Sequence, residues 1–163
     1  QEMKPKFKLT FIDEPKPLGT AGGLSLLEGK IKKPFIVTNC DTIININFDD
    51  LMHFHISNNN DATLVVSSKE HIIPYGTCKL TKKGHLQKII EKPKFDFFVN
   101  VGMYVLNPNL IKLIPKNKTY DMTDLIQLVK SKKKQVGVYP IDDESWIDVG
   151  QWSEYRKAIE KLI

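Results

Sequence analysis

The sequence contains little cysteine, a single arginine and no long apolar run. Its 163 residues include two cysteines, Cys40 and Cys78, whose separation fits neither a metal-binding nor a redox motif. So few cysteines favour a reduced, cytoplasmic setting. No apolar run approaches the roughly 20 residues of a membrane helix, and the polar, lysine-rich amino end does not resemble a signal peptide. We therefore expect no membrane partner.

Positive charge is in modest excess, with 24 basic and 19 acidic side chains and a formal net charge of +5. An excess of this sign favours phosphate-bearing ligands or nucleic acid. Much of it lies in Lys130 and Lys132–Lys134, between a predicted helix and a predicted strand. A short lysine run without interleaved aromatics is typical of a solvated loop, so we expect no nucleic-acid partner.

The stretch from Phe35 to Asp41 is the centre of the predicted fold. Four apolar or β-branched residues lead directly into Asn39, Cys40 and Asp41, which predicts a strand buried on both faces, as in a parallel sheet. In open α/β sheets, ligands bind beyond the carboxyl ends of such strands, so Asp41 is a candidate ligand-binding carboxylate. The alternative is that Asp41 only caps the next turn, because Asp and Asn favour turns.

At the front of the chain, predicted strands alternate with predicted helices, whereas the predicted strands in the middle of the chain look antiparallel. Together these patterns predict an α/β fold with a mixed sheet. Two histidines in the second predicted helix, His53 and His55, lie two residues apart and cannot share a helix face, so we expect surface or packing roles. On that helix Leu51, Phe54 and Ile56 are the predicted buried side chains. We expect strands over 7–13, 62–67, 97–106 and 136–141, a hairpin of 77–80 with 86–91, and helices over 24–28, 47–57, 108–114, 121–130 and 152–163.

Several short motifs carry weak functional signals on their own. Gly19–Gly23 precede a predicted helix that Thr20 could cap, and such a turn either offers N–H groups to an anion or is a simple turn. Glu91 and Lys92 lie at a strand end before Pro93, and Gly102 interrupts a strand, which often marks the close approach of a ligand or backbone.

Six of these motifs occur in an order that resembles the sugar-1-phosphate nucleotidyltransferases. They are Leu18-Gly19-Thr20-Ala21-Gly22, Val37-Thr38-Asn39-Cys40-Asp41, Pro74-Tyr75-Gly76, Glu91-Lys92-Pro93, Asn100-Val101-Gly102-Met103-Tyr104 and Trp146-Ile147-Asp148-Val149-Gly150. The sequence is most similar to guanylyltransferase-like members that make mannose- or heptose-type nucleotide sugars, some of which carry CBS domains. The resemblance implies a Rossmann-like, glycosyltransferase A-like three-layer α/β/α fold. It also implies the transfer of a nucleotidyl group from a nucleoside triphosphate to a sugar 1-phosphate, with release of pyrophosphate. The similarity to guanylyltransferases implies that the nucleoside triphosphate is GTP.

The resemblance also assigns roles to individual residues. Asp41 and Asp148 would hold one Mg²⁺, which brings the two phosphate-bearing substrates together; the alternative for Asp148 is a buried cap of the final helix. Lys92 would pair with the sugar phosphate and Glu91 would accept hydrogen bonds from sugar hydroxyls. The base and ribose of the nucleotide would contact Gly19, Thr20 and Ala21, and Gly76 would leave space for the sugar. The wall on the sugar side would consist of Asn100, Val101 and Gly102.

Two features depart from the family pattern. Cys40 stands where the family usually has Gly. More important, the family's Gly-Gly-x-Gly-x-Arg-Leu loop and Pro-Lys pair have no match before Leu18. We therefore expect residues 1–163 to be the carboxy-terminal two thirds of one amino-terminally truncated nucleotidyltransferase domain, inactive alone, with uncovered strand edges that favour self-association. The alternative function is a non-catalytic nucleotide-sugar-binding or regulatory module.

Overall fold

The computed structural model describes residues 7–150, so the expected closing helix over 152–163 lies outside the described residues. The strands are β1 (Phe35–Thr38), β2 (Thr42–Ile44), β3 (Ala62–Ile72), β4 (Thr77–Leu80), β5 (Leu86–Ile90), β6 (Lys94–Leu106), β7 (Val136–Ile141) and β8 (Trp146–Asp148). The α-helices are α1 (Gly19–Gly22), α2 (Phe48–Ser57) and α3 (Met122–Ser131), and the 3₁₀ helices are η1 (Gly23–Leu27), η2 (Pro108–Leu113) and η3 (Asp143–Ser145).

The central sheet has the strand order β1-β6-β3-β7. Strand β6 runs antiparallel to both β1 and β3, and β3 runs parallel to β7, so the expected mixed sheet is confirmed. It follows that β1, β3 and β7 all point the same way. Two further pairs, β2 with β8 and β4 with β5, form small antiparallel sheets of their own.

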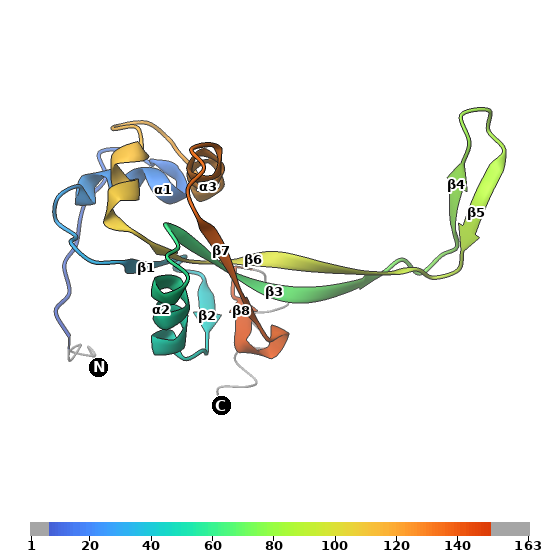
Figure 1. Cartoon of the computed structure of the whole chain (residues 1–163), viewed down its shortest axis with the longest axis horizontal. Coiled ribbons are helices and arrows are strands. Elements are labelled where there is room, and N and C mark those ends of the chain that lie inside the picture. Colours follow the sequence, from blue (N-terminus) through green and yellow to red (C-terminus); the bar gives the residue numbers. More distant parts are fainter. Residues whose placement is uncertain (1–6, 151–163) are drawn as a thin grey trace.

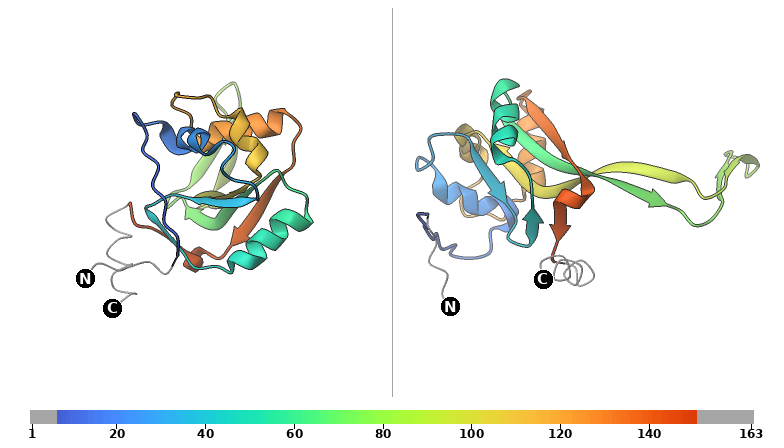
Figure 2. Two further views of the ribbon diagram at one scale, coloured as in Figure 1. Left: turned by 90° about the vertical axis from the view of Figure 1, so that its left-hand side faces the viewer. Right: turned by 90° about the horizontal axis from the view of Figure 1, so that it is seen from below.

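Helical elements cover both faces of the sheet, which gives three layers (Figures 1 and 2). Strand β6 shows how the period-two alternation of a strand supplies two cores. Its residues Tyr104 and Leu106 pack with α3 and η2, whereas Val101, Met103 and Val105 pack on the opposite face with Leu51 of α2. The described body therefore has a hydrophobic core on each side of β6.

The two longer helices form where the sequence predicts them. Asn47 caps α2 by accepting hydrogen bonds from the N–H groups of Asp49 and Asp50. Helix α3 buries an apolar stripe at the spacing of one helix face, namely Met122, Leu125, Ile126 and Val129, as expected. Within residues 7–150, no helix combines the length and apolarity needed to cross a membrane.

Three local expectations were wrong. Residues 7–13 form no strand, and Phe11 is 80% exposed, because no described strand lies beside this segment to pair with it. The strand from Phe35 ends at Thr38 and lies at the edge of the sheet, half-buried and antiparallel to its one described neighbour, β6. Thr20 does not cap the helix that follows it; its hydroxyl accepts the N–H of Met122 at 2.8 Å and so caps α3.

Strands β3 and β6 continue beyond the body as a long two-stranded ribbon, which carries the β4–β5 hairpin at its far end (Figure 1). The pairing of β4 with β5 confirms the predicted hairpin. We call residues 68–98 the arm. Most arm side chains are exposed to solvent, including those of Leu80 and Ile89.

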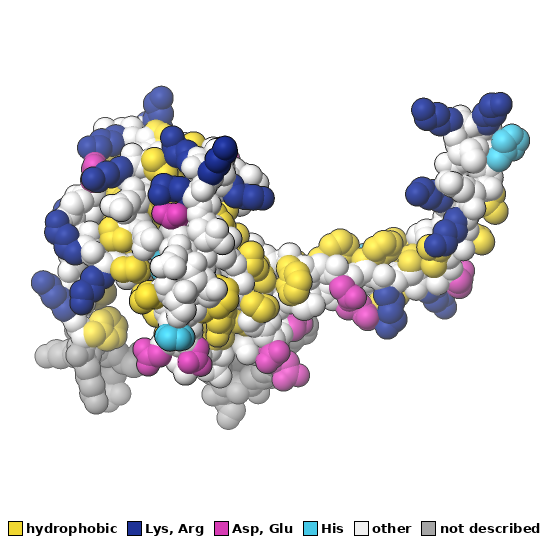
Figure 3. Space-filling model, viewed as in Figure 1, with side chains coloured by type: hydrophobic (Ala, Val, Ile, Leu, Met, Phe, Trp, Pro, Cys, Tyr) yellow, Lys and Arg dark blue, Asp and Glu magenta, His cyan; other side chains and the backbone are white. Residues whose placement is uncertain are grey.

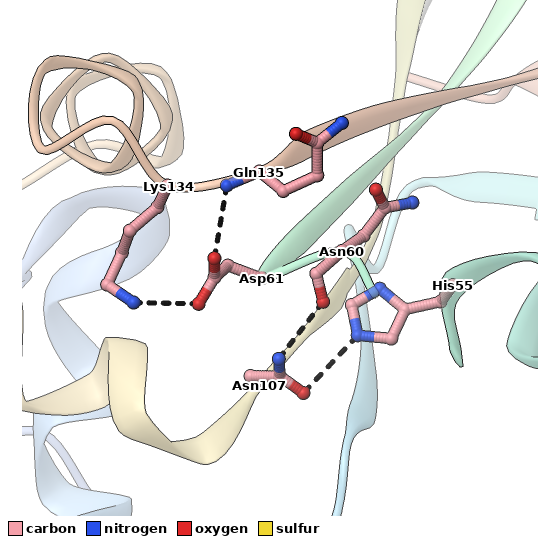
Figure 4. A network of polar contacts seen from close by, with 6 residues as sticks. All are labelled: His55, Asn60, Asp61, Asn107, Lys134 and Gln135. Carbon is pink, nitrogen blue, oxygen red and sulfur yellow. Dashed lines mark hydrogen bonds and ion pairs between the residues drawn. The ribbon is translucent and has the colours of Figure 1, made fainter. Parts of the chain in front are cut away.

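His55 holds a buried polar network where α2 meets the sheet (Figure 4). The side chain is only 1% exposed; its Nδ1 lies 2.8 Å from Thr63 Oγ1 and its Nε2 lies 3.4 Å from Asn107 Oδ1. Asn107 also donates to the carbonyl of Asn60. The packing role expected for His55 is therefore confirmed, whereas Ile56, expected to be buried, is 58% exposed.

A second part of the same network joins the strand ends (Figure 4). Asp61 forms an ion pair with Lys134 at 2.7 Å and accepts the N–H of Gln135 at 3.1 Å. These contacts fix the start of β7 beside the start of β3. Lys134, part of the lysine run, thus has a structural partner.

We predict that His55 makes the protein less stable below its ordinary pKa of 6.5. Burial lowers the pKa of His55, with Asn107 and Asp61 opposing the shift, so the unfolded chain binds this proton more readily than the folded one. The free energy of unfolding should therefore fall as the pH drops below about 6.5. Urea titrations between pH 8 and pH 5 measure it.

The matched control is His53→Gln, which changes an exposed histidine of the same helix. His53→Gln should keep the pH dependence of wild type, and His55→Gln should flatten it. Equal pH dependence in both variants would contradict this assignment.

Candidate active site

A polar pocket lies just beyond the carboxyl end of β1, the kind of place at which α/β sheets bind ligands. Asp41 follows β1 after two residues, and Asp148 is the last residue of β8. The β2–β8 ladder places Thr42 opposite Asp148 and so draws these segments together. The cavity measures about 200 Å³ and is lined by Asn39, Asp41, Thr42, Asn100, Val101, Gly102, Tyr104, Trp146 and Asp148.

The two aspartates lie beside one another in this pocket. The N–H of Val149 donates to the carbonyl oxygen of Asp41 at 2.9 Å, and the N–H of Gly150 donates to Asp148 Oδ1 at 3.0 Å. A Cβ added to Gly150 would lie 3.1 Å from Asp148 Oδ1 and 3.1 Å from Asp41 Oδ2. One carboxylate oxygen of each aspartate therefore borders the same small space.

This donor set fits a Mg²⁺ ion. Mg²⁺ needs oxygen ligands and is commonly held by one or two carboxylates, with water and substrate phosphate completing the shell. Within residues 7–150, no group of three histidine, cysteine or acidic side chains could hold a metal by itself. A pair of carboxylates suits an ion that takes the rest of its ligands from the substrate.

Asn100 orders the opposite wall of the pocket. Its Oδ1 accepts the N–H of Gly102 at 3.1 Å, and its Nδ2 donates to the hydroxyl of Tyr104. Burial raises the pKa of Tyr104, with the Asn100 hydrogen bond opposing the shift, so the hydroxyl stays protonated at neutral pH. Val101 is buried in the core beneath this wall.

Position 102 requires a glycine because of its backbone conformation and because Asn39 lies close to it. Its φ is +78°, and an added Cβ would lie 2.6 Å from Asn39 Nδ2. The N–H of Asn39 also donates to the carbonyl of Gly102 at 3.0 Å. The interruption of this strand therefore marks the close approach of Asn39, at the point where β1 leaves the sheet.

Trp146 lines the pocket, and Lys69 and Asp143 support it from outside the lining. The Lys69 Nζ lies 5.2 Å from the centroid of the Trp146 ring and forms an ion pair with Asp143, which also accepts the hydroxyl of buried Ser67 at 3.3 Å. The indole Nε1 of Trp146 is buried and has no acceptor among the described residues. These contacts hold the segment that leads into β8.

The glycine-rich turn of residues 19–23 lies away from the pocket, and the N–H groups of Thr20 and Ala21 already have hydrogen-bond acceptors within the protein. Thr20 donates its N–H to Asp121 Oδ1 at 3.1 Å, and Ala21 donates its N–H to the carbonyl of Tyr120 at 2.9 Å. Gly19 has a φ of +77°, and a Cβ there would lie 2.6 Å from Asp121 Oδ1. In this structure Gly19, Thr20 and Ala21 join α1 to α3 and do not line the pocket.

Gly76, Glu91 and Lys92 also lie away from the pocket, at the base of the β4–β5 hairpin. A Cβ on Gly76 would lie 2.8 Å from Glu91 Oε2, so this glycine faces the predicted sugar-binding carboxylate. The ribbon from Asn100 back to Lys94 spans about 20 Å at the usual rise of a strand. The structure brings together Asp41, Asp148, Asn100, Val101 and Gly102, and it leaves Glu91 and Lys92 on the arm.

Four lining residues had no predicted role: Asn39, Thr42, Tyr104 and Trp146. The alternation of β6 contained a signal for Tyr104, since residues 100, 102 and 104 share one face of a strand. Trp146 and Thr42 could not be found in this way, because their position depends on the β2–β8 pairing.

A family model described as Nucleotidyl transferase matches residues 1–163, the whole chain. The chain belongs to the sugar-1-phosphate nucleotidyltransferase family. Mannose-1-phosphate guanyltransferase 2 of Candida glabrata is 35% identical over 156 residues, 90% of this chain and 42% of that protein. The mannose-1-phosphate guanyltransferase of Saccharomyces cerevisiae is 33% identical over the same shares, so this nucleotidyltransferase chain spans less than half of the length of these relatives.

Solved structures share the fold. HddC from Yersinia pseudotuberculosis matches with a TM-score of 0.71 at 23% identity, over 98% of this chain and 69% of that one. A structure of HddC complexed with GMP-PN matches with a TM-score of 0.67 at 24% identity, over 94% and 66%. The Rossmann-like nucleotidyltransferase fold expected from the sequence is therefore confirmed.

We predict that Gly102→Ala lowers the free energy of unfolding by about 3 kcal/mol, because it combines left-handed strain with a clash against Asn39. The matched control is Gly84→Ala. Gly84 has a φ of +82° but no neighbouring atom within 4 Å, so only the strain of about 1 kcal/mol applies. Urea unfolding measures both variants, and equal losses would contradict the close packing of Asn39 on Gly102.

Proposed function

We propose that the whole protein transfers a nucleotidyl group from a nucleoside triphosphate to a sugar 1-phosphate, giving a nucleotide sugar and pyrophosphate. The observation that carries this proposal is the paired carboxylates of Asp41 and Asp148 at the carboxyl edge of the sheet. GTP and mannose 1-phosphate are the proposed substrates. They are supported by the names of the relatives and by the GMP-PN complex of HddC.

Six of the pocket residues have proposed roles in this reaction. Asp41 and Asp148 would hold Mg²⁺, which supplies positive charge to offset the repulsion between the two phosphates. The attacking oxygen belongs to a phosphate that is already ionised, so no side chain has to remove a proton from it. The wall formed by Asn100, Val101 and Gly102 would bound the sugar, and the protonated hydroxyl of Tyr104 would hold Asn100 in position.

Six residues outside the pocket keep their predicted roles as proposals. Lys92 would pair with the sugar phosphate, Glu91 would accept from sugar hydroxyls, and Gly76 would leave space beside the sugar. Gly19, Thr20 and Ala21 would border the base and ribose. Because the N–H groups of Thr20 and Ala21 already have internal partners, contact with the base would use the exposed surface of this turn.

We further propose that residues 1–163 are the carboxy-terminal two thirds of the catalytic domain and do not turn over substrate alone. The sequence holds no Gly-Gly-x-Gly-x-Arg-Leu loop to bind the departing pyrophosphate. The proposed compartment is the cytoplasm, supported by two exposed free thiols, Cys40 and Cys78. CBS domains elsewhere in the protein remain a family-based prediction.

The test separates an enzyme domain from a metal-independent binding module. Calorimetry of the chain with GDP-mannose should show binding that requires Mg²⁺, and Asp41→Asn or Asp148→Asn should weaken it at least about tenfold, since each removes a charged metal ligand. The control Asp124→Asn changes an exposed acid in the first turn of α3 and should bind as wild type does.

Two outcomes would contradict the proposal. Binding of equal strength with and without Mg²⁺ would favour the non-catalytic module. Radiolabelled turnover of GTP with mannose 1-phosphate by the isolated chain, at rates typical of enzymes, would disprove the need for a separate phosphate-binding loop.

A further inference from the structure

The strand that carries Asp148 depends on contacts outside its own ladder. Strand β8 is three residues long and begins at Trp146, which lies opposite Ile44 of β2. Trp146 and Asp148 are two residues apart and therefore share one face of β8, and both line the pocket. A pair of strands this short is marginal by itself. The position of Asp148 therefore depends on what holds Trp146.

Trp146 is held by apolar packing and by a nearby cation. Its side chain packs against the buried cluster that includes Leu51, Val101 and Met103. Lys69 Nζ lies 5.2 Å from the centroid of the ring, and an ammonium within about 6 Å of an indole ring is attracted to its face. The indole Nε1 is buried and has no acceptor among the described residues, so none of them fixes the ring through a hydrogen bond to Nε1.

Asp143 holds Lys69 in place. Its carboxylate forms an ion pair with the Lys69 ammonium and accepts the hydroxyl of Ser67 at 3.3 Å. Ser67 and Lys69 are two residues apart in β3, so they share one face of that strand, and Ser67 is fully buried. Asp143 is thus bonded to two side chains of one strand, and one of those side chains is fixed in the body.

These contacts join two parts of the chain that no strand ladder joins. Lys69 belongs to the root of the arm, where it lies opposite Phe97, and the arm stands out from the body beyond this root (Figures 1 and 3). Asp143 begins η3, three residues before Trp146. Strands β3 and β8 lie in different sheets. The Lys69–Asp143 pair therefore ties the root of the arm to the small sheet that carries Asp148.

We propose that Lys69 and Asp143 are positioning residues for the cation site, although neither lines the pocket. Their contacts hold Trp146 against the core, and the short strand β8 passes that position on to Asp148. Loss of either partner lets Asp148 move away from Asp41. Two carboxylates that no longer face one space bind Mg²⁺ more weakly, because this ion demands near-ideal octahedral geometry.

The effect on cation binding rests on the proposed function, but the effect on the position of β8 does not. The two effects are therefore measured separately, the first with Mn²⁺ as the probe and the second without any ligand.

Hydrogen exchange of a single amide measures the position of β8. The N–H of Val149 donates to the carbonyl oxygen of Asp41 at 2.9 Å, so its exchange rate reports how often these two segments separate. Lys69→Met removes the charge and keeps most of the side-chain length. It should speed the exchange of Val149 about tenfold, because the ion pair and the cation–π contact are lost together. Asp143→Asn should have a similar effect.

Two further variants serve as controls for the exchange experiment. Lys69→Arg should exchange as wild type does, since a guanidinium also pairs with a carboxylate and stacks on an aromatic ring. Lys94→Met removes a different exposed ion pair of the same ribbon, which Lys94 forms with Glu70 at 3.2 Å. It should leave the exchange of Val149 unchanged, because β8 can separate from β2 without breaking that pair.

Cation affinity is measured by titration with Mn²⁺, with the free ion followed by electron paramagnetic resonance. Lys69→Met should weaken Mn²⁺ binding about tenfold, the lower end of the effect of residues that orient metal ligands. A simple charge effect predicts the opposite, since removal of a positive charge near the site favours a cation. Lys69→Arg and Lys94→Met should bind Mn²⁺ as wild type does.

The outcomes distinguish this proposal from the proposed function. Unchanged exchange of Val149 in Lys69→Met, or equal acceleration in Lys94→Met, would overturn the positioning role. Mn²⁺ binding by Lys69→Met that equals or exceeds that of wild type would overturn it as well. A wild-type chain that binds no Mn²⁺ would refute the cation site of the proposed function, and the exchange of Val149 would still decide whether Lys69 and Asp143 hold β8.

Discussion

The antiparallel pairing of β2 with β8 is the interaction on which the candidate site depends. It joins residues 42–44 to residues 146–148, which are about a hundred positions apart in the sequence. The ladder is only three residues long, and it is supported from both sides. Ile44 and Trp146 pack into the core with α2, and the Lys69–Asp143 ion pair holds the segment that leads into β8. Without this pairing, Asp41 and Asp148 would belong to separate loops.

The common direction of β1, β3 and β7 explains why the site forms at this edge. Asn39, directly after β1, donates its N–H to the carbonyl of Gly102 on β6, and Ser67, within β3, donates its hydroxyl to Asp143, which follows β7. Strand β6 runs the opposite way and contributes Asn100 and Gly102 from its interior. The sheet therefore positions oxygen and amide groups around the pocket, while the exposed arm carries Glu91 and Lys92, two of the residues predicted to bind the sugar phosphate.

Much of this arrangement could be predicted from local patterns in the sequence. The apolar stripe of α3 and the alternation of β6 gave their positions, because both depend on neighbouring residues. The local pattern of residues 7–13 could not show that they form no strand, because a strand needs a pairing partner and none of the described strands supplies one. The edge position of β1 and the use of Thr20 as a cap of α3 depend on contacts with residues far along the chain. The metal roles of Asp41 and Asp148 came from family resemblance, and the structure adds their proximity.

The central claim is that Asp41 and Asp148 form one binding site for a divalent cation, and Mn²⁺ relaxation measured by NMR tests it most directly. Mn²⁺ in substoichiometric amounts broadens the amide signals of residues close to it. The signals of residues 39–42, 101–102 and 148–150 should broaden first, and those of the β4–β5 hairpin should stay sharp. Broadening confined to the exposed acids Asp49, Asp50, Asp142 and Glu144 would contradict the account. So would broadening of the pocket signals that Asp41→Asn and Asp148→Asn do not both remove.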